Sequence, residues 1–425
     1  MSARMTRLTG PIVSLVAVAL FLGVLSERVE LFLVTVPLLV MLFLASLRAE
    51  QPEYTLAHEV STARVFEGDR LSVTVTVTAR SRIPLLELFE PLPSAVALAS
   101  GDNRVVFSLE PGERIRWSYE VRCLGRDQFT LGTIYARLWD RSGLRVREAR
   151  HRAENPVRVY PRTEPLRRLP QPRRTQTSVG NYVSPTFGEG LEPGDIRPFA
   201  PGDRVRHVNW RSSLRLGKLY VTQHHQERNA DVVLVLDTLS QVGPPSATTL
   251  DLCARAVASL ARAYLSRKDR VGLIEYGGFL NWVRPGSGSS QMERVLDRLL
   301  GAEIIFSYVT KDLALVPPRV LPPQALVIAL SPLLDERFVK AMGDLIARGF
   351  DVVLLSICPV DLTRGFLSAS PLDALACRLW ALERQAKLAQ LRRQGLTIVE
   401  WHPDQPLELA LAPLIHRRRW RTLPG

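Results

Sequence analysis

The sequence predicts three folded parts: a transmembrane helical hairpin, a small β-sandwich, and a doubly wound α/β domain. Two long apolar stretches near the N-terminus indicate the hairpin. Short alternating stretches of β-branched residues between turns indicate the sandwich. Apolar strands that alternate with helical stretches in the second half indicate a parallel sheet covered by helices. The predicted boundaries are 1–50 for the hairpin, 51–160 for the sandwich, 161–228 for a linker with a turn-rich basic segment, and 229–425 for the α/β domain.

The hairpin prediction rests on two uncharged stretches, from Leu8 to Ser26 and from Leu31 to Leu47. A helix rises 1.5 Å per residue, so each stretch spans roughly 25–28 Å, close to the thickness of the hydrocarbon core. Only Glu27 to Glu30 separate them. A signal peptide has a shorter apolar region followed by a small-residue cleavage site, and no such site is evident. We therefore expect a tight hairpin with two spans.

The charged residues predict how the chain is oriented in the membrane. Its 55 Lys and Arg against 42 Asp and Glu give a net charge of +13, which favours an anionic neighbour such as membrane lipid. Basic residues flank the apolar stretches, and the positive-inside rule then places both ends in the cytoplasm. We expect a two-pass plasma-membrane protein whose bulk is cytoplasmic. The flanking residues are Arg4, Arg7, Arg48 and Arg64.

The cysteines fit a reduced cytoplasmic body. They are isolated, form no CxxC pair and lack metal-ligand spacing, so we expect buried thiols. The histidines give no metal signal either, because His224 and His225 are adjacent and point to opposite faces of a strand. Trp401–Asp404 is a loop after the last predicted strand, and we expect no nucleophile near it. The four cysteines are Cys123, Cys253, Cys358 and Cys377.

The middle of the chain predicts the sandwich and a linker. Strands are expected at Arg70–Thr78, Arg104–Leu109, Arg114–Val121 and Thr130–Leu138, separated by glycine-containing turns. Such a module would serve as a spacer or for docking. The stretch 161–178 is rich in proline and arginine, which indicates either a linker or a loop held down by other contacts.

The α/β domain begins with Asp231 to Asp237, a continuous apolar run that ends in a carboxylate, as expected of a buried parallel strand. In such sheets ligands bind beyond the carboxyl ends of the strands, which draws attention to Asp237 and Ser331. Further strands are predicted at Val271–Tyr276, Ala325–Ser331, Asp351–Ile357 and Thr397–Trp401, a hairpin-like stretch at Phe279–Val283, and helices at Thr249–Arg267, Gln291–Leu300, Glu336–Arg348 and Leu372–Arg393.

The segment from Pro193 to Arg215 has neither helical nor clean strand periodicity, so we expect it to be irregular. Its Pro-Gly-Asp turn can bond neighbouring backbone N–H groups, and its guanidinium groups can pair with carboxylates or stack on Trp210. Two interpretations stay open: a structural network that fastens the segment to the α/β domain, and a docking surface with arginine anchors. The residues concerned, here the signature residues, are Gly194, Asp195, Arg197, Gly202, Asp203, Arg206, Trp210, Arg215 and Glu227.

With Phe199, Ser213, Leu219 and Val221, the signature residues resemble the bacterial domain-of-unknown-function family fifty-eight, DUF58. Gly125-Arg126 and the stretch Asp140–Leu144 upstream are similar to that family as well, so the resemblance covers nearly the whole chain. Two positions differ mildly from the family: this chain has Phe199 where the family often has Tyr, and Leu214 where the family often has Ala. The resemblance implies an N-terminal membrane hairpin and a von Willebrand factor A-like domain.

That domain type usually holds a divalent metal through an Asp-x-Ser-x-Ser loop, a distant Thr and a later Asp. Here Asp237 and Thr310 match, but Leu239 and Gln241 replace both serines. Pro332 stands where the later Asp is expected. Hard cations need several oxygen ligands. We therefore expect a degenerate site around Asp237 and Thr310, without a metal or another cofactor.

No P-loop, GxGxxG, HExxH or GxSxG motif lies in a suitable context, so we expect no enzyme activity. The sequence predicts a membrane-anchored scaffold or adaptor that binds a protein partner. The resemblance implies that members of this family are often encoded beside a MoxR-type AAA+ ATPase. We therefore expect such an ATPase as the partner, in assembling or maturing cell-envelope complexes. The alternative is a metal-dependent hydrolase at the carboxyl edge of the sheet. A nucleic-acid binder is disfavoured, because the basic residues form no platform with aromatic ones.

Overall fold

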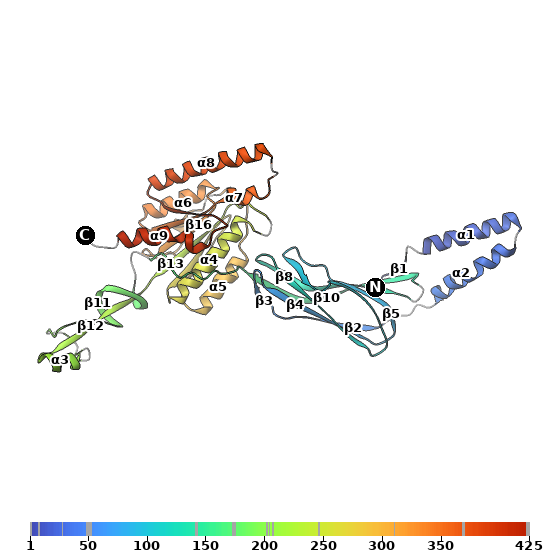
Figure 1. Cartoon of the computed structure of the whole chain (residues 1–425), viewed down its shortest axis with the longest axis horizontal. Coiled ribbons are helices and arrows are strands. Elements are labelled where there is room, and N and C mark those ends of the chain that lie inside the picture. The colour runs from blue at the N-terminus through green and yellow to red at the C-terminus, as the bar shows by residue number, and fades with distance from the viewer. Residues whose placement is uncertain are drawn as a thin grey trace. The chain divides into compact units, whose positions relative to one another are not determined.

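The structure, a computed structural model, describes residues 2–6, 9–27, 29–47, 53–140, 143–171, 176–200, 203, 205, 208–244, 247–309, 311–367 and 370–421. The chain divides into two compact units, Met1–Tyr160 and Pro161–Gly425 (Figure 1). Each unit has its own hydrophobic core. The first contains two apolar helices and two β-sheets, and the second contains an α/β domain and a two-stranded ribbon.

Helices α1 (Thr9–Ser26) and α2 (Val29–Leu47) follow one another and pack together (Figure 1). Val16 and Gly23 of α1 are buried, whereas Phe21 is 67% and Leu25 72% exposed. By length and composition, α1 is the one helix in the described part of the chain that qualifies to cross a membrane. The first predicted span is thus supported as an apolar helix, and the second span stays a prediction.

Two sheets of the first unit pack over one core, drawn from both of them. The alternation predicted for Arg70–Thr78 is present, because Leu71, Val73, Val75 and Val77 are all fully buried. One sheet has the order β1–β10–β9–β5–β7 with β3 beside β10, and the other has the order β2–β4–β8–β6. The strands are β1 (Ser2–Met5), β2 (Tyr54–Val60), β3 (Arg64–Phe66), β4 (Arg70–Ala79), β5 (Ile83–Phe89), β6 (Val96–Ser100), β7 (Arg104–Leu109), β8 (Arg114–Cys123), β9 (Asp127–Trp139) and β10 (Arg145–Tyr160).

The chain segments on both sides of the helical pair belong to this β unit. Strand β1, which precedes α1, pairs antiparallel with Arg145–Glu148 of β10. Next to it, Thr6 donates from its backbone N–H to Leu144 O at 2.9 Å and from its hydroxyl to Gly143 O at 2.9 Å. Strand β2 follows α2 and pairs with β4. Strand β1 is not predictable from the sequence, because four residues are too few to show a period.

The α/β domain of the second unit contains a six-stranded sheet of order β15–β14–β13–β16–β17–β18. Each strand and helix predicted from Asp231 to Trp401 is present, and all neighbouring strands are parallel except β15, which is antiparallel at the edge. The elements are β13 (Asp231–Thr238), α4 (Thr249–Ser266), β14 (Arg270–Gly277), β15 (Leu280–Gly286), α5 (Ser289–Leu300), β16 (Leu326–Ser331), α6 (Glu336–Ala347), β17 (Asp351–Ile357), α7 (Pro359–Arg364), α8 (Pro371–Arg393), β18 (Thr397–Trp401) and α9 (Leu407–Arg421).

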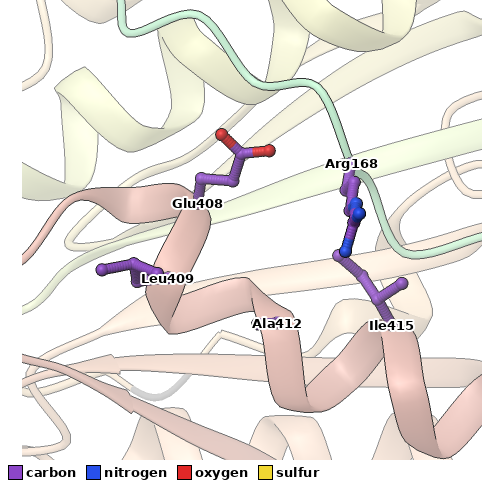
Figure 2. Close-up of a pocket in the computed structure, with 5 residues that line it drawn as sticks. All are labelled: Arg168, Glu408, Leu409, Ala412 and Ile415. Carbon is purple, nitrogen blue, oxygen red and sulfur yellow. The ribbon is translucent and has the colours of Figure 1, made fainter.

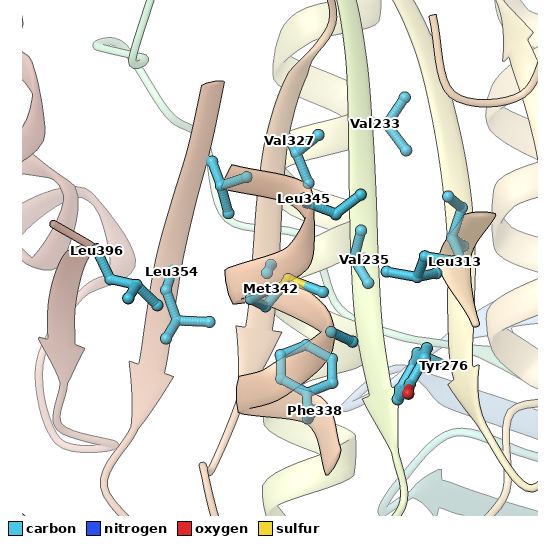
Figure 3. Packing of buried hydrophobic residues seen from close by; sticks show 14 of the residues in the cluster. Val233, Val235, Tyr276, Leu313, Val327, Phe338, Met342, Leu345, Leu354 and Leu396 are labelled. Carbon is cyan, nitrogen blue, oxygen red and sulfur yellow. The ribbon is translucent and has the colours of Figure 1, made fainter. Parts of the chain in front are cut away.

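Both faces of this sheet are covered. Val233 and Val235 of β13 pack in one cluster with the apolar side of α6, while the alternate residues of β13 are equally buried beneath α4. Figure 3 shows the first face, where Phe338, Met342 and Leu345 of α6 lie over β13, β16 and β17. The chain order reverses between β13 and β16, so their carboxyl ends flank the switch point where such sheets bind ligands.

The proline-rich segment 161–171 is held against the α/β domain, which decides between the two predicted alternatives for this part. Tyr264 of α4 donates to Pro170 O at 2.6 Å, and Arg267 donates to Arg167 O at 2.7 Å. Glu164 accepts from the backbone N–H of Leu407 at 3.2 Å, where α9 begins. Residues 161–171 therefore form a strap across α4 and α9 rather than a free linker; residues 172–175 lie outside the described part.

Candidate functional site

The signature segment is more regular than the sequence predicted. Strand β11 (Gln176–Pro198) pairs antiparallel with β12 (Tyr220–Asn229), and helix α3 (Trp210–Leu216) lies between them in sequence. The prediction of an irregular segment is thus wrong at both ends. Cross-strand pairing supplies a regularity that the sequence does not show as a hydrophobic period.

Local caps at both ends explain the short helix α3. The Asn209 side chain accepts from Ser212 N at 3.0 Å, which satisfies an N-terminal donor. Gly217 adopts φ 68°, and its N–H bonds to Ser213 O, which closes the C-terminus. The Ser213 hydroxyl also accepts from Tyr220 N at 2.9 Å and so ties the helix to β12. These contacts stabilise a helix of seven residues.

Arg197 and Asp203 form the best-defined pair of the signature. Two guanidinium nitrogens donate to the two carboxylate oxygens at 2.7 and 2.6 Å. Asp203 also accepts from Ala200 N at 2.8 Å, as expected of an aspartate that closes a Pro-Gly-Asp turn. The hydrogen bond to Asp203 raises the pKa of Arg197 further. This pair organises the turn between β11 and α3.

The other signature residues fall into three groups. Trp210 is 59% exposed at the start of α3, and Arg215 is exposed in its last turn. Gly194, Asp195 and Glu227 belong to β11 and β12 by their backbone, and nothing further is assigned to them. Gly202 and Arg206 lie outside the described residues, as does Thr310. In the described part, cation–π contacts occur at Arg150 over Tyr135 and at Arg348 over Phe350, so the expected stacking on Trp210 is not among them.

The carboxyl edge of the sheet, to which the sequence directed attention, brings Asp237 and Ser331 together, because β13 and β16 are neighbours. Asp237 is fully buried; its carboxylate accepts from Ser331 Oγ at 2.5 Å and from Leu239 N at 3.0 Å. Burial raises the pKa of Asp237 to about 7, although both hydrogen bonds favour its charged form. Leu239, one of the two serine replacements, packs against the hydrophobic core. The Asp237 oxygens are therefore engaged by protein donors.

Asp335, three positions after Pro332, is the carboxylate near the place where the later Asp of the metal loop is expected. In this structure its oxygens bond other groups of the protein. It caps α6 by accepting from Arg337 N at 2.9 Å, and it pairs with the Arg337 guanidinium at 2.7 Å. The bond to Arg337 holds the pKa of Asp335 below its usual range. Arg337 also donates to Ser307 O at 2.5 Å and fixes the loop before the 3₁₀ turn at Leu313–Leu315.

Three groups at the same edge were not connected by sequence reasoning. Cys358 follows β17 and is buried, Asp361 lies in α7, and His402 follows β18. One ligand-type atom from each lies within 4.8 Å of the other two, and His402 Nδ1 lies 2.7 Å from Asp361 Oδ2. A thiol and a carboxylate thus lie beside the Trp401–Asp404 loop, near which no nucleophile was expected. The available signal was that Cys358 and His402 each follow a predicted strand.

A small pocket lies between the strap and α9 (Figure 2). It has a volume of about 170 Å³ and is lined by Arg168, Glu408, Leu409, Ala412 and Ile415. Figure 2 shows the Arg168 side chain directed from the strap toward Ile415. Its size suits a few water molecules rather than a substrate, so it does not alter the assignment of the site.

Comparison with known proteins finds a family match in the central part of the chain. Residues 195–360 match the family described as protein of unknown function DUF58. The uncharacterised protein YeaD of Bacillus subtilis is 22% identical over 252 residues, which cover 58% of this chain and 62% of YeaD. The uncharacterised protein Rv1480 of Mycobacterium tuberculosis is 28% identical over 120 residues, covering 28% of this chain and 38% of Rv1480. The chain thus spans less than two thirds of these relatives.

Solved structures resemble only parts of the chain. The cupredoxin domain of amoB from Nitrosocaldus yellowstonii has a TM-score of 0.18 and 13% identity, and the match covers 25% of this chain and 86% of that domain. Alpha-2-macroglobulin from Escherichia coli, from domain MG7 to the C-terminus, has a TM-score of 0.20 and 15% identity, covering 27% and 25%.

Proposed function

We propose that this protein is a membrane-anchored, non-enzymatic adaptor that presents the signature helix α3 to a protein partner. The observation that carries the proposal is an ordered but exposed helix. Caps at Asn209 and Gly217 hold α3, yet Trp210 is 59% and Leu214 83% exposed. An ordered surface with exposed tryptophan, leucine and arginine has the composition of a binding hot spot. The exposed arginines of the same helix are Arg211 and Arg215.

The anchor of the adaptor is the helical pair α1–α2, which we propose spans the membrane twice. Apolar side chains are exposed on both helices: Phe21 is 67% and Phe43 62% exposed. In water such surfaces would be costly, whereas in lipid they are the ordinary state of a spanning helix. Strands β1 and β2, which flank the pair in sequence, both belong to the β unit. A two-pass hairpin satisfies this connection, because it returns the chain to the side from which it started.

The positive-inside rule makes that side the cytoplasm, with the net charge of +13 favourable beside anionic lipid. A reporter fused to each terminus tests this topology. Both fusions should be active only as cytoplasmic reporters. Opposite locations of the two ends would show a single span and would overturn the two-pass anchor.

The α/β domain, in this proposal, is a von Willebrand factor A-like domain with a degenerate metal loop. Support comes from Asp237, whose oxygens accept bonds from Ser331 and Leu239, and from the packing of Leu239 in the core. Magnesium would need further oxygen ligands at this point. We expect no thermal shift with Mg²⁺ or Mn²⁺; a saturable shift removed by Asp237→Asn would instead favour the alternative, a metal-dependent hydrolase.

The partner we propose is a MoxR-type AAA+ ATPase, which the resemblance to DUF58 implies, acting in assembly or maturation of cell-envelope complexes. The test is retention of the purified ATPase by the full chain in detergent. Trp210→Ala and Leu214→Ala should each weaken retention, by roughly 30-fold in Kd if each is a hot spot of about 2 kcal/mol.

The matched control for this experiment is Leu409→Ala on α9, which removes a side chain with 63% exposure from the same unit. It should bind as the wild type does. The charge reversal Arg215→Glu should weaken binding more at low than at high salt, because it acts on an exposed charge. Equal retention by all variants would remove the α3 surface from the proposal, and no retention by the wild type would remove the ATPase as partner.

A further inference from the structure

The ends of β17 and β18 bring together a thiol, a carboxylate and an imidazole. Register pairs Ile357 of β17 with Trp401 of β18, and Cys358 N donates to Trp401 O at 2.9 Å just beyond this pair. Cys358 and His402 are therefore the first residues after two hydrogen-bonded parallel strands. Asp361 joins them from the first turn of α7. Pairing of the two strands thus sets the distance between the backbones of Cys358 and His402.

We propose that Cys358, Asp361 and His402 form a binding site for a soft divalent cation of the Zn²⁺ class. One ligand-type atom from each lies within 4.8 Å of the others. In a tetrahedral zinc site with bonds of about 2.0–2.3 Å, ligand atoms lie about 3.3–3.7 Å apart, so small side-chain rotations suffice. Three protein ligands leave a fourth position for water or for a donor from a bound molecule.

The donor set is selective by its chemistry. Thiolate and imidazole favour Zn²⁺ over Mg²⁺ or Ca²⁺, which prefer sites made of oxygen alone. Cys358 is buried, and His402 and Asp361 are 40% and 35% exposed on their side chains, which provides a path from solvent. Burial raises the pKa of the Cys358 thiol. The free thiol is thus a poor nucleophile, and an ion would take the place of its proton.

A buried arginine fixes the strand end that carries the thiol. Arg384 of α8 donates to Ile357 O at 2.9 Å and to Ser356 Oγ at 2.6 Å. Its charge is balanced by Glu400 Oε1, to which Arg384 Nε donates at 2.8 Å. Outer groups of this kind orient metal ligands. The positive charge of Arg384 is thus paired with the Glu400 carboxylate.

The direct test is Co²⁺ binding by the full chain in detergent under reducing conditions. Cobalt should bind at one ion per chain with a thiolate-to-metal absorption band in the near ultraviolet, and Zn²⁺ should displace it. Cys358→Ser should abolish the band, and His402→Gln should weaken binding more than about 100-fold, beyond the loss typical of an outer-shell change. No band in the wild type, or a band that survives Cys358→Ser, would overturn the site.

Matched controls separate ligation from packing. Cys377→Ala removes a thiol from the same apolar cluster as Cys358 but not from the ligand set, and Asp404→Asn removes a carboxylate from the loop that carries His402. Both should bind Co²⁺ as the wild type does, and loss of binding in either would contradict the three-ligand site. If Cys358→Ser does not fold, the wild type still decides: Zn²⁺ should slow alkylation of Cys358 while leaving that of Cys123 unchanged.

Discussion

Each unit of this protein buries a carboxylate, and the two are held in different ways. Glu90 of the β unit is 1% exposed and accepts from Tyr119 Oη at 2.7 Å, from Gly132 N at 2.7 Å and from His58 Nε2 at 3.1 Å. Asp237 of the α/β domain is fully buried and accepts from Ser331 and Leu239 only, among its described hydrogen bonds. One carboxyl group has three donors, and the other has two.

Glu90 belongs to a network that links strands, whereas Asp237 is a group whose protonation can change near neutral pH. His58 Nδ1 in turn bonds Asn155 Nδ2 at 2.7 Å, so the Glu90 network joins strands of both sheets. Asp237 lies instead at the carboxyl edge of a parallel sheet, with its pKa raised to about 7 by burial. A carboxyl group with a pKa near 7 at such an edge can gain or lose its proton when the pH or a nearby charge changes.

The largest effect is expected from Glu90→Ala. It leaves three buried donors without their acceptor, and breaking a buried charged network costs about 3–5 kcal/mol of unfolding free energy. Urea unfolding followed by fluorescence of Trp117, which lies in the same core, measures it. Glu120→Ala is the control, because Glu120 is 40% exposed and pairs with Arg70 at 3.4 Å. That exposed pair should contribute at most about 1 kcal/mol, and similar losses in both variants would contradict the comparison.

Asp237→Asn should change the pH dependence of stability. Because the folded pKa of about 7 lies above the ordinary value of 3.8, the native state binds an extra proton between these two pH values. The stability contribution is fully present below pH ~4 and is lost as the pH rises through 7. Relative to wild type, the variant should therefore gain stability from pH 5 to pH 8, by at most about 3 kcal/mol, because about two pH units lie between pH 5 and the pKa of about 7.

Thermal unfolding of both proteins at several pH values measures this gain. The difference between variant and wild type is the useful quantity, since Asp335 and Asp361 have lowered pKa values and contribute the opposite slope to both. A difference that stays constant across the pH range would show that Asp237 does not titrate there.

A smaller effect is expected from Ser331→Ala, which removes the hydroxyl that bonds Asp237 and accepts from Leu333 N at 2.8 Å. We expect a loss of about 1–2 kcal/mol. The pKa of Asp237 should rise further, because the lost bond favours the charged form. Ser356, opposite Ser331 on β17, is the control, since its hydroxyl bonds Arg384 instead. Ser331→Ala should couple with Asp237→Asn in a double-mutant cycle, whereas Ser356→Ala should be additive.

The sequence predicted the α/β domain well and the signature segment poorly, for a physical reason. Buried parallel strands such as Asp231–Thr238 are continuous apolar runs, and helices such as Thr249–Ser266 carry a helical period. Those signals arise from burial. Strands β11 and β12 and helix α3 are held by pairing and by caps, which leave little periodicity. Asn209 and Gly217 were available as cap signals for α3 and were not used.

The candidate sites show the same limit. Asp237 and Ser331 could be expected at the carboxyl edge, because each ends a predicted parallel strand, but the sequence did not predict that these two strands are neighbours. Cys358 and His402 also follow predicted strands, yet their proximity depends on β17 and β18 being neighbours, which the sheet order decides. A sequence without an alignment does not give the order of the strands. Spacing rules for metal ligands also fail for residues this far apart in the chain.

The smallest effect is expected from Arg197→Ala at the exposed turn of the signature. Global thermal stability should change little, because the pair with Asp203 is accessible to water and screened by salt. Amide exchange at Ala200 should accelerate, because Asp203 accepts from Ala200 N only while the turn is held in place. Exchange at Leu234 in the buried strand β13 should remain unchanged. Protection that persists at Ala200 would show that the turn holds without its guanidinium, and the signature would then owe its order to the ribbon alone.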